Sequence, residues 1–240
     1  MKKIIISIVV FTCCLFAGNS FFAQKLGGNG NLKEKEIAIS NVNSFEINSN
    51  FNIWLFQDND EKVVIKTDEN LLDYIDVKIV GNVLTASIKK NVEITEFKAM
   101  ILSISVKDVK SIKLSGASNL ATRYPLNLSD LSVNISGNST ADLKMTGNLL
   151  NLVNSGAGKI ILYGNANNFN LESTGSTNVY AKDFVVANAD LKVSGSSEME
   201  INVTNNLKAE ISGSSVLNYL GNPTTNVSTA GSSIVKKMIK

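Results

Sequence analysis

A glycine recurs seven times at nearly constant spacing in the second half of the chain, and a small residue precedes each copy. The six intervals are 21, 19, 19, 20, 18 and 18 residues. Glycine adopts backbone angles that other residues avoid, and small hydroxyl residues bond nearby amides, so this pattern is typical of a tight corner. Such regularity predicts a repeat architecture. The predicted corner residues are Gly116, Gly137, Gly156, Gly175, Gly195, Gly213 and Gly231.

The residues on either side of each glycine alternate between apolar and polar. The fifth residue before each glycine is polar in all seven copies. The fourth before it is always apolar: Ile112, Val133, Leu152, Leu171, Leu191, Ala209 and Val227. The fourth after it is also apolar: Leu120, Ala141, Ile160, Val179, Met199, Leu217 and Val235. A period of two indicates strands with one buried face, so each repeat is predicted to be two short strands joined at a corner.

A repeat of this length cannot bury its apolar side chains alone. Stacking successive repeats at about 4.8 Å gives each strand a parallel neighbour and aligns the inward side chains. The sequence therefore predicts an all-β fold, a parallel β-solenoid of about seven two-strand repeats over residues 111–235, followed by a short Lys-rich tail at 236–240. An antiparallel sandwich of hairpins is the alternative, but it gives no reason for one residue type at one phase seven times.

Residues 24–110 alternate too, without the corner, and are predicted to form a β-rich region that packs on or caps the solenoid. A helical turn is expected at Asn70–Ile75 and a hairpin turn at Gly81–Asn82. The aromatic residues of this region are expected to close the first layer: Phe45, Phe51, Trp54, Phe56 and Tyr74. The expected strands are Phe45–Phe56, Lys62–Lys66, Asp76–Val80, Leu84–Lys89 and Met100–Val106.

The first 23 residues resemble a secretory signal peptide. Lys2 and Lys3 precede an uncharged apolar run over Ile4–Ala17, and Ala23 is a small residue at the expected cleavage point. A membrane anchor is the alternative, but about 14 apolar residues fall short of the roughly 20 that span a bilayer. We therefore expect an exported protein, in the periplasm, on the outer-membrane surface or secreted, without a transmembrane segment in the mature chain.

Charge and composition exclude several classes of binding and catalytic function. The chain has 23 basic and 21 acidic residues, and losing Lys2 and Lys3 leaves 21 of each, which is too neutral for nucleic-acid binding. It has no histidine, which excludes Ser-His and Cys-His catalysis and His-ligated zinc. Both cysteines, Cys13 and Cys14, lie in the predicted leader, so the mature chain is expected to have no thiol or disulfide. No cofactor, metal or catalytic residue is predicted.

Three outward residues at one phase of successive repeats are Glu172, Lys192 and Glu210. In a stack the two carboxylates would lie about 9.6 Å apart, which is near the separation in an inverting glycosidase. Lys192 would lie between them and neutralise both, so a surface ion ladder is the favoured interpretation.

Two further motifs favour structural interpretations. Asp58, Asp60 and Glu61 lack the alternating ligands and central glycine of a calcium loop, and a solvated hairpin turn is preferred. The Ser-x-x-Lys spelling at Ser233–Lys236 falls in a predicted strand instead of the helix that such an active site needs.

Trp54, Tyr163 and Tyr180 are candidate ligand contacts, because aromatic faces can stack on sugars; burial against neighbouring layers is the alternative.

The ordered series of motifs resembles the putative auto-transporter adhesin, head GIN domain family of exported Bacteroidetes-type proteins. The residues that carry the resemblance are Asn70-Leu71, Gly81 to Leu84, Lys113 to Gly116, Ser155 to Gly158 and Ile211 to Ser214. The resemblance covers nearly the whole predicted mature chain. It implies a β-helical envelope protein, often labelled an adhesin, with no catalytic residues. In this chain most corners carry one glycine with Ser or Thr instead of a glycine pair.

These observations favour a non-enzymatic, exported cell-envelope or surface interaction protein. Its expected partners are glycan or an envelope or host-surface protein, and its oligomeric state is open. Two alternatives stand beside this hypothesis. One is a carbohydrate-active β-helix enzyme, such as a polysaccharide lyase or hydrolase, although Arg123 is the only arginine in the repeats. The other is a structural or envelope-stress component without a soluble ligand.

Overall fold

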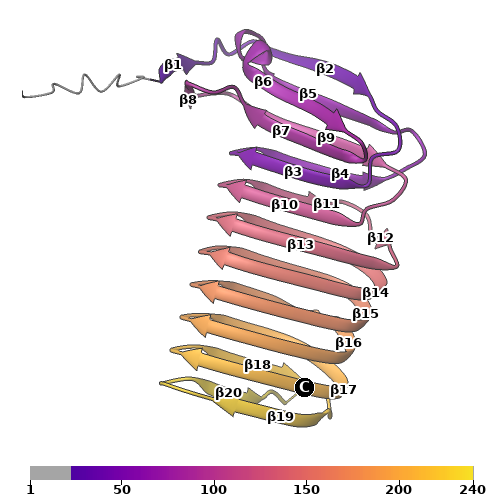
Figure 1. Cartoon of the computed structure of the whole chain (residues 1–240), viewed down its shortest axis with the longest axis vertical. Coiled ribbons are helices and arrows are strands. Elements are labelled where there is room, and N and C mark those ends of the chain that lie inside the picture. The colour runs from indigo at the N-terminus through magenta and orange to yellow at the C-terminus, as the bar shows by residue number, and fades with distance from the viewer. Residues whose placement is uncertain (1–22, 240) are drawn as a thin grey trace, which may run out of the picture.

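The computed structural model describes residues 23–239. Strands follow one another along a single long axis, with the N-terminal region at one end and the C-terminus near the other (Figure 1). No helix within this range is long and apolar enough to cross a membrane. Residues 1–22 of the predicted leader lie outside the described range.

The N-terminal region contains nine strands and one short helix. The predicted helical turn is confirmed as the 3-10 helix η1, and the predicted turn at Gly81–Asn82 joins the antiparallel strands β6 and β7. Strands β1, β2 and β8 were not predicted. The elements are β1 (Gln24–Gly27), β2 (Leu32–Ala38), β3 (Ser44–Ser49), β4 (Asn52–Gln57), β5 (Lys62–Asp68), η1 (Glu69–Tyr74), β6 (Ile75–Val80), β7 (Val83–Ile88), β8 (Val92–Glu96) and β9 (Met100–Val106).

The repeat region is a parallel β-solenoid, as predicted, and its successive layers pair in register. In β14 to β17 the second strand of one repeat and the first strand of the next form one long bent strand that ends at the corner glycine. The elements are β10 (Ser111–Gly116), β11 (Asn119–Thr122), β12 (Leu126–Asn127), β13 (Asp130–Gly137), β14 (Thr140–Gly156), β15 (Lys159–Gly175), β16 (Asn178–Gly195), β17 (Glu198–Gly213), β18 (Val216–Leu220), β19 (Thr224–Thr229) and β20 (Ile234–Lys237).

The predicted apolar columns form the interior of the stack. Leu152, Leu171 and Leu191 pair in order across three layers, and all three are at most 2% exposed. The column after the corner is equally continuous, from Leu120 to Val235. Stacking therefore buries side chains that one repeat could not cover.

Close backbone approach explains why the corners need glycine. A Cβ atom on Gly195 would lie 2.1 Å from the carbonyl oxygen of Gly175 in the preceding layer, and its φ is 120°. Gly156 lacks a positive φ, but a Cβ there would also lie 2.1 Å from the Gly137 oxygen. The same close approach to the preceding corner recurs at Gly137, Gly175, Gly213 and Gly231.

Parallel pairing extends beyond the repeats that the glycine spacing identifies. Strand β3 pairs with β10, and β4 pairs with β11, so that Ser49 lies opposite Gly116. The prediction of one strand over Phe45–Phe56 is wrong, because the chain turns between β3 and β4 as it does at each corner. A serine in place of glycine hides this corner from a search based on glycine.

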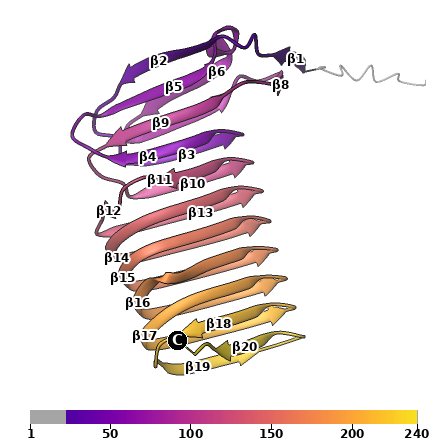
Figure 2. The same ribbon diagram turned by 180° about the vertical axis from the view of Figure 1, so that it is seen from behind.

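The N-terminal end of the stack is closed by antiparallel strands and η1. Strand β2 pairs with β5, and β5 pairs with β9 (Figure 2), while β6 pairs with β7. Leu71 of η1 is fully buried in this cap. Of the expected aromatic residues, Phe45 and Phe51 are buried. Trp54 is 38% exposed, so the prediction that it closes the first layer is wrong: its strand position points outward.

A buried carboxylate holds the cap to two loops. The side chain of Asp68 is fully buried and accepts hydrogen bonds from the backbone N–H groups of Gly30, at 2.6 Å, and Lys98, at 2.7 Å. Burial by itself raises the pKa of Asp68, but the backbone donors outweigh that effect and hold the pKa below its ordinary value. Asp68 is therefore ionised in the folded protein at neutral pH.

Candidate functional site

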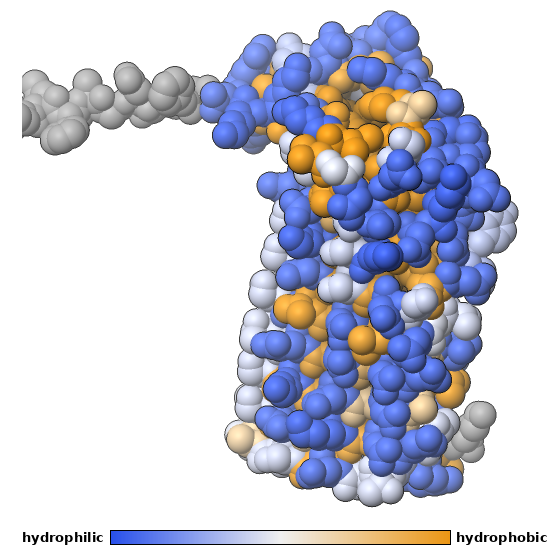
Figure 3. Space-filling view, turned by 45° about the vertical axis from the view of Figure 1, so that its right-hand side comes forward, coloured by the Kyte–Doolittle hydropathy of each residue, from blue (hydrophilic) through white to orange (hydrophobic). Residues whose placement is uncertain are grey.

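The strands ahead of the corners present a regular polar surface, which we call the rung face. It consists of the outward side chains one, three and five residues before each corner, continued onto β3 and β7. The column one residue before the corner carries small polar side chains from Ser87 to Ser212. The middle column runs Thr85, Glu46, Lys113, Asn134, Val153, Glu172, Lys192, Glu210 and Ser228. The surface over the repeats is mainly hydrophilic, and a larger apolar group lies near the cap (Figure 3).

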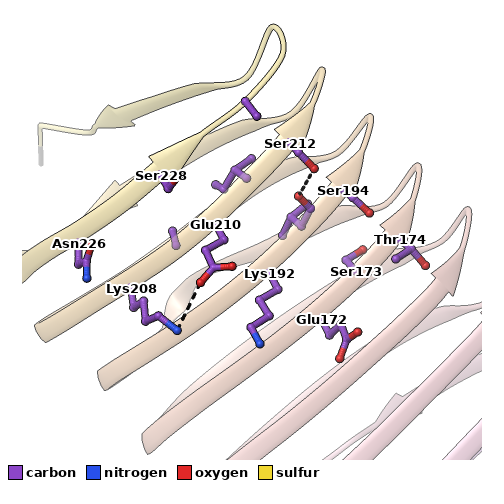
Figure 4. Close-up of a pocket in the computed structure, with 14 residues that line it drawn as sticks. Glu172, Ser173, Thr174, Lys192, Ser194, Lys208, Glu210, Ser212, Asn226 and Ser228 are labelled. Atoms are coloured by element: carbon purple, nitrogen blue, oxygen red, sulfur yellow. Dashed lines mark hydrogen bonds and ion pairs between the residues drawn. The ribbon is translucent and has the colours of Figure 1, made fainter.

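Open hollows lie along the rung face, and two of them contain both charged and hydroxyl side chains. The first, of about 520 Å³, is lined by Glu172, Lys192 and Glu210 together with Ser194 and Ser212 (Figure 4). These side chains come from β15, β16 and β17 and project from neighbouring strands toward the same space. The second hollow, of about 540 Å³, lies nearer the cap, and Glu46, Lys113, Ser115 and Asn134 contribute to its lining. Both hollows combine hydroxyl groups with one or more charges of each sign.

The predicted ion ladder is wrong in its partners. Lys192 forms no ion pair within residues 23–239. Instead, the Lys208 ammonium lies 3.2 Å from the Asp190 carboxylate and 3.5 Å from that of Glu210. Lys208 lies on the same strand and face as Glu210, two residues away. Its side chain therefore reaches both along its own strand and across to Asp190 in the preceding layer. The hydrogen bond to Asp190 is the main reason why the pKa of Lys208 is raised. Lys192 and Glu172 therefore remain available to a ligand.

The hydroxyl residues two positions after the corners face the interior. Ser215 Oγ donates to the Gly195 carbonyl oxygen at 3.2 Å and accepts from the Ser197 N–H at 3.2 Å. This arrangement links successive layers and buries all of these hydroxyls except that of Ser233 in the last layer. The buried members are Ser118, Ser139, Thr177, Ser197 and Ser215.

One layer lacks this hydroxyl, because Gly158 takes its place. There Asn154 points inward and its amide nitrogen donates to Thr177 Oγ1. Asn154 Oδ1 and the neighbouring Ser173 Oγ have no hydrogen-bond partner among the described residues, although both residues are about 1% exposed. Asn154 therefore bonds to the hydroxyl of the following layer, and a partly unsatisfied polar pair remains beside it.

Replacing Ser173 with alanine is expected to stabilise the protein by about 1 kcal/mol. The substitution removes a buried hydroxyl that lacks a partner, and such a group costs about 1–3 kcal/mol. Chemical denaturation measures the change. Ser215→Ala is the matched control and should destabilise, because that hydroxyl is bonded on both sides. A loss of stability in Ser173→Ala would contradict this account of the pair.

Asparagine side chains form ladders that the sequence analysis missed. Asn206 donates to Asn188, which donates to Asn168, at 2.8 and 3.1 Å. Asn170 donates to Asn151 at 2.7 Å. The signal was present as Asn at a fixed phase, seven or five residues before the corner glycine. These amides bond to one another along the edge of the rung face and stiffen it.

The three candidate aromatic contacts lie after the corners, on the opposite side of the stack. Each ring has a cation over it: Arg123 is 5.7 Å from the Trp54 centroid, Lys144 is 6.0 Å from that of Tyr163, and Lys159 is 5.2 Å from that of Tyr180. Trp54 and Tyr163 are 38% and 37% exposed. The structure does not bring these rings together with the rung face.

The remaining candidates occupy structural positions. In the turn between β4 and β5, Asp60 pairs with Lys62 at 2.5 Å and Asp58 Oδ1 accepts from the Asp60 N–H. Ser233 Oγ donates to the Gly213 carbonyl oxygen, and Lys236 lies in β20. Over residues 23–239, no three His, Cys, Asp or Glu side chains are grouped so that they could hold a metal ion.

Comparison with known sequences identifies one family. The sequence model of the family described as "Putative auto-transporter adhesin, head GIN domain" matches residues 41–223. The match includes the N-terminal layers and all but the last corner. No curated protein matches the chain.

Solved structures of similar fold include several putative adhesins from Bacteroidetes. A putative adhesin from Bacteroides fragilis is 22% identical with a TM-score of 0.81, covering 89% of this chain and all of its own. Putative adhesins from Parabacteroides distasonis and Parabacteroides merdae are 23% and 26% identical, with TM-scores of 0.75 and 0.72. Each match covers 90% of this chain and the whole of the other. The solenoid and its cap are therefore shared architecture.

Proposed function

This chain belongs to the putative auto-transporter adhesin, head GIN domain family, and from that premise we propose that it is a non-enzymatic, exported adhesion module of the cell envelope. We propose that it binds glycan or protein through the rung face. The observation that carries the proposal is the first hollow, where Glu172 and Lys192 are exposed and form no ion pair within the described residues, beside the hydroxyls of Ser194 and Ser212. Aligned hydroxyls and charges at a fixed spacing suit repeated weak contacts with an extended ligand.

The chemistry of the rung face supports binding over catalysis. A reaction needs reactive groups held at one point, and most catalytic acids and bases have strongly shifted pKa values. On the rung face the hydrogen bond from Lys208 to Asp190 and the charge of that carboxylate raise the pKa of Lys208, so this amine stays protonated. A protonated lysine is a binding group and not a general base.

Binding of the purified exported protein to glycan arrays and to immobilised envelope extract tests the proposal. We expect retention that Ser194→Trp abolishes, because the new ring fills the first hollow. Asp73→Trp, at an exposed position of η1 in the cap and away from both surfaces, should bind as the unmodified protein does. Absence of retention on both surfaces, or turnover of a polysaccharide, would contradict the proposal.

Trp54, Tyr163 and Tyr180 are proposed as a second contact for the same ligands, since the rings remain partly exposed. Tyr180→Ala in the same assay separates the two surfaces. Loss of retention in Tyr180→Ala together with full retention in Ser194→Trp would move the binding surface to the opposite side of the stack.

A further inference from the structure

Over six successive layers the charges of the middle column of the rung face are arranged symmetrically, and Glu210 lies outside this set in the seventh layer. Numbering the layers from β3 as zero, the acids Glu46 and Glu172 lie in layers zero and four, and the bases Lys113 and Lys192 lie in layers one and five. The uncharged Asn134 and Val153 occupy layers two and three, at the centre. Reversing the order of these layers exchanges every acid with a base.

We infer that the rung face binds a second copy of this chain, with the two stacks antiparallel and related by a two-fold axis between the layers of Asn134 and Val153. In this arrangement the ion pair that Glu46 and Lys113 form within one chain, at 2.7 Å, lies against the partner's Lys192 and the partner's Glu172. Glu46 faces the partner's Lys192, and Lys113 faces the partner's Glu172. The axis generates each contact twice, which gives four opposite-charge contacts across one interface. This inference rests on the proposed function only in using the rung face as the contact surface.

The columns one and five residues before the corner are also compatible with this two-fold arrangement. In the column nearest the corner every side chain from layer zero to layer five is uncharged, and Ser115 faces the partner's Thr174. In the column five residues before the corner, Ser44 faces the partner's Asp190, so no like charges meet. Val153, which is 38% exposed on this polar face, lies next to the two-fold axis and loses contact with water.

Charge selects this register over its neighbours. Sliding the partner by one layer in one direction places Glu46 against the partner's Glu172. Sliding it in the other direction places Glu46 against the partner's Glu210 and Lys113 against the partner's Lys192. Like charges in direct opposition disfavour both alternatives.

The size of the face predicts a weak contact. Eight layers at about 4.8 Å and five residues at about 3.3 Å give a backbone area of roughly 34 by 13 Å. An interface of this size falls near or below the roughly 1,200 Å² that marks the lower limit of stable complexes. We therefore expect a reversible dimer that dissociates on dilution and in high salt.

Sedimentation velocity over a concentration series tests the inference with the purified exported protein. The unmodified chain should dimerise at low ionic strength. Lys113→Glu and Glu172→Lys should each weaken association at least tenfold, because each places like charges in two symmetric contacts. Lys159→Glu, on the opposite side of the stack, is the control and should leave the dimer unchanged.

The decisive experiment is sedimentation velocity on a mixture of the two weakened variants. In a heterodimer of Lys113→Glu with Glu172→Lys, both contacts regain opposite charges, so association should recover without any further substitution. A chain that stays monomeric, or variants that dimerise as the unmodified chain does, would overturn the inference. Failure of the two variants to associate on mixing would overturn it as well. A monomer that still binds glycan or envelope extract through the first hollow would leave the proposed function standing.

Discussion

Gly195→Ala is expected to lower the free energy of unfolding by about 4 kcal/mol or more. The new methyl group would lie 2.1 Å from the Gly175 carbonyl oxygen, and the backbone would have to keep a φ of 120°. A residue other than glycine held at such an angle costs about 1–3 kcal/mol, and overpacking against fixed backbone adds a comparable amount. Because the oxygen belongs to the adjacent layer, relief requires the two layers to separate locally. Urea denaturation of the variant and the unmodified protein measures the difference.

Two other glycines separate the steric cost from the backbone cost. Gly156→Ala creates the same 2.1 Å contact without a positive φ, so it isolates the clash between layers. Gly81→Ala has a φ of 62° in the hairpin turn, and its methyl group would meet nothing within 4 Å, so it isolates the backbone cost at about 1 kcal/mol. If Gly81→Ala destabilised the protein as much as Gly195→Ala, close packing of the corners would not explain the repeated glycine.

Asp68→Ala is expected to cost about 3–5 kcal/mol and to loosen the cap. The substitution removes the acceptor of the Gly30 and Lys98 N–H groups, whose hydrogen bonds to the carboxylate are partly buried, at about 1–3 kcal/mol each. Differential scanning calorimetry should show a lower midpoint, and hydrogen exchange should accelerate first at Gly30 and Lys98. Asp73→Ala, which removes an exposed acid from η1, is the control and should have little effect.

The depressed pKa of Asp68 also predicts how stability varies with pH. A carboxyl with a lower pKa in the folded state stabilises the protein above its unfolded pKa of about 3.9, and the contribution disappears as the pH falls through the folded value. Asp68→Asn should therefore flatten the stability curve below about pH 4 and leave its shape unchanged near neutrality. An identical acid dependence in Asp68→Asn and the unmodified protein would contradict this role.

The repeats were predictable because their physics is local and periodic. The glycine marks the corner of each repeat. The apolar residues four positions before and four positions after it identify the buried face of each strand, and the recurrence of this pattern predicts stacking. Ser49 shows where this reasoning ends: the same corner forms there without glycine, because its pairing with Gly116 is set by strands far apart in sequence. Closure of the cap by Leu71 was hidden for the same reason.

The rung face was predictable only in part. The phase of Glu172, Lys192 and Glu210 placed them correctly in successive layers, since a strand alternates its faces. The ion partners were not predictable, because the reach of Lys208 to both Asp190 and Glu210 depends on side-chain rotamers and not on layer order. The inward direction of Asn154 follows from strand alternation, because it occupies the same position as Leu114 and Ile135 in the preceding layers. Its hydrogen bond to Thr177 is visible only in three dimensions.

Engineered disulfides test layer order most directly. Lys159 and Asn178 are exposed partners in adjacent layers, whereas Thr140 and Asn178 lie two layers apart. Paired residues of adjacent strands lie about 4.8 Å apart, within the 4.4–6.8 Å range of Cα separations in disulfides, and two layers exceed it. In a background with Cys13 and Cys14 replaced by alanine, mild oxidation should crosslink Lys159→Cys/Asn178→Cys within one chain and leave Thr140→Cys/Asn178→Cys reduced. Efficient crosslinking of the second pair, or none in the first, would contradict a solenoid whose layers follow the order of the sequence.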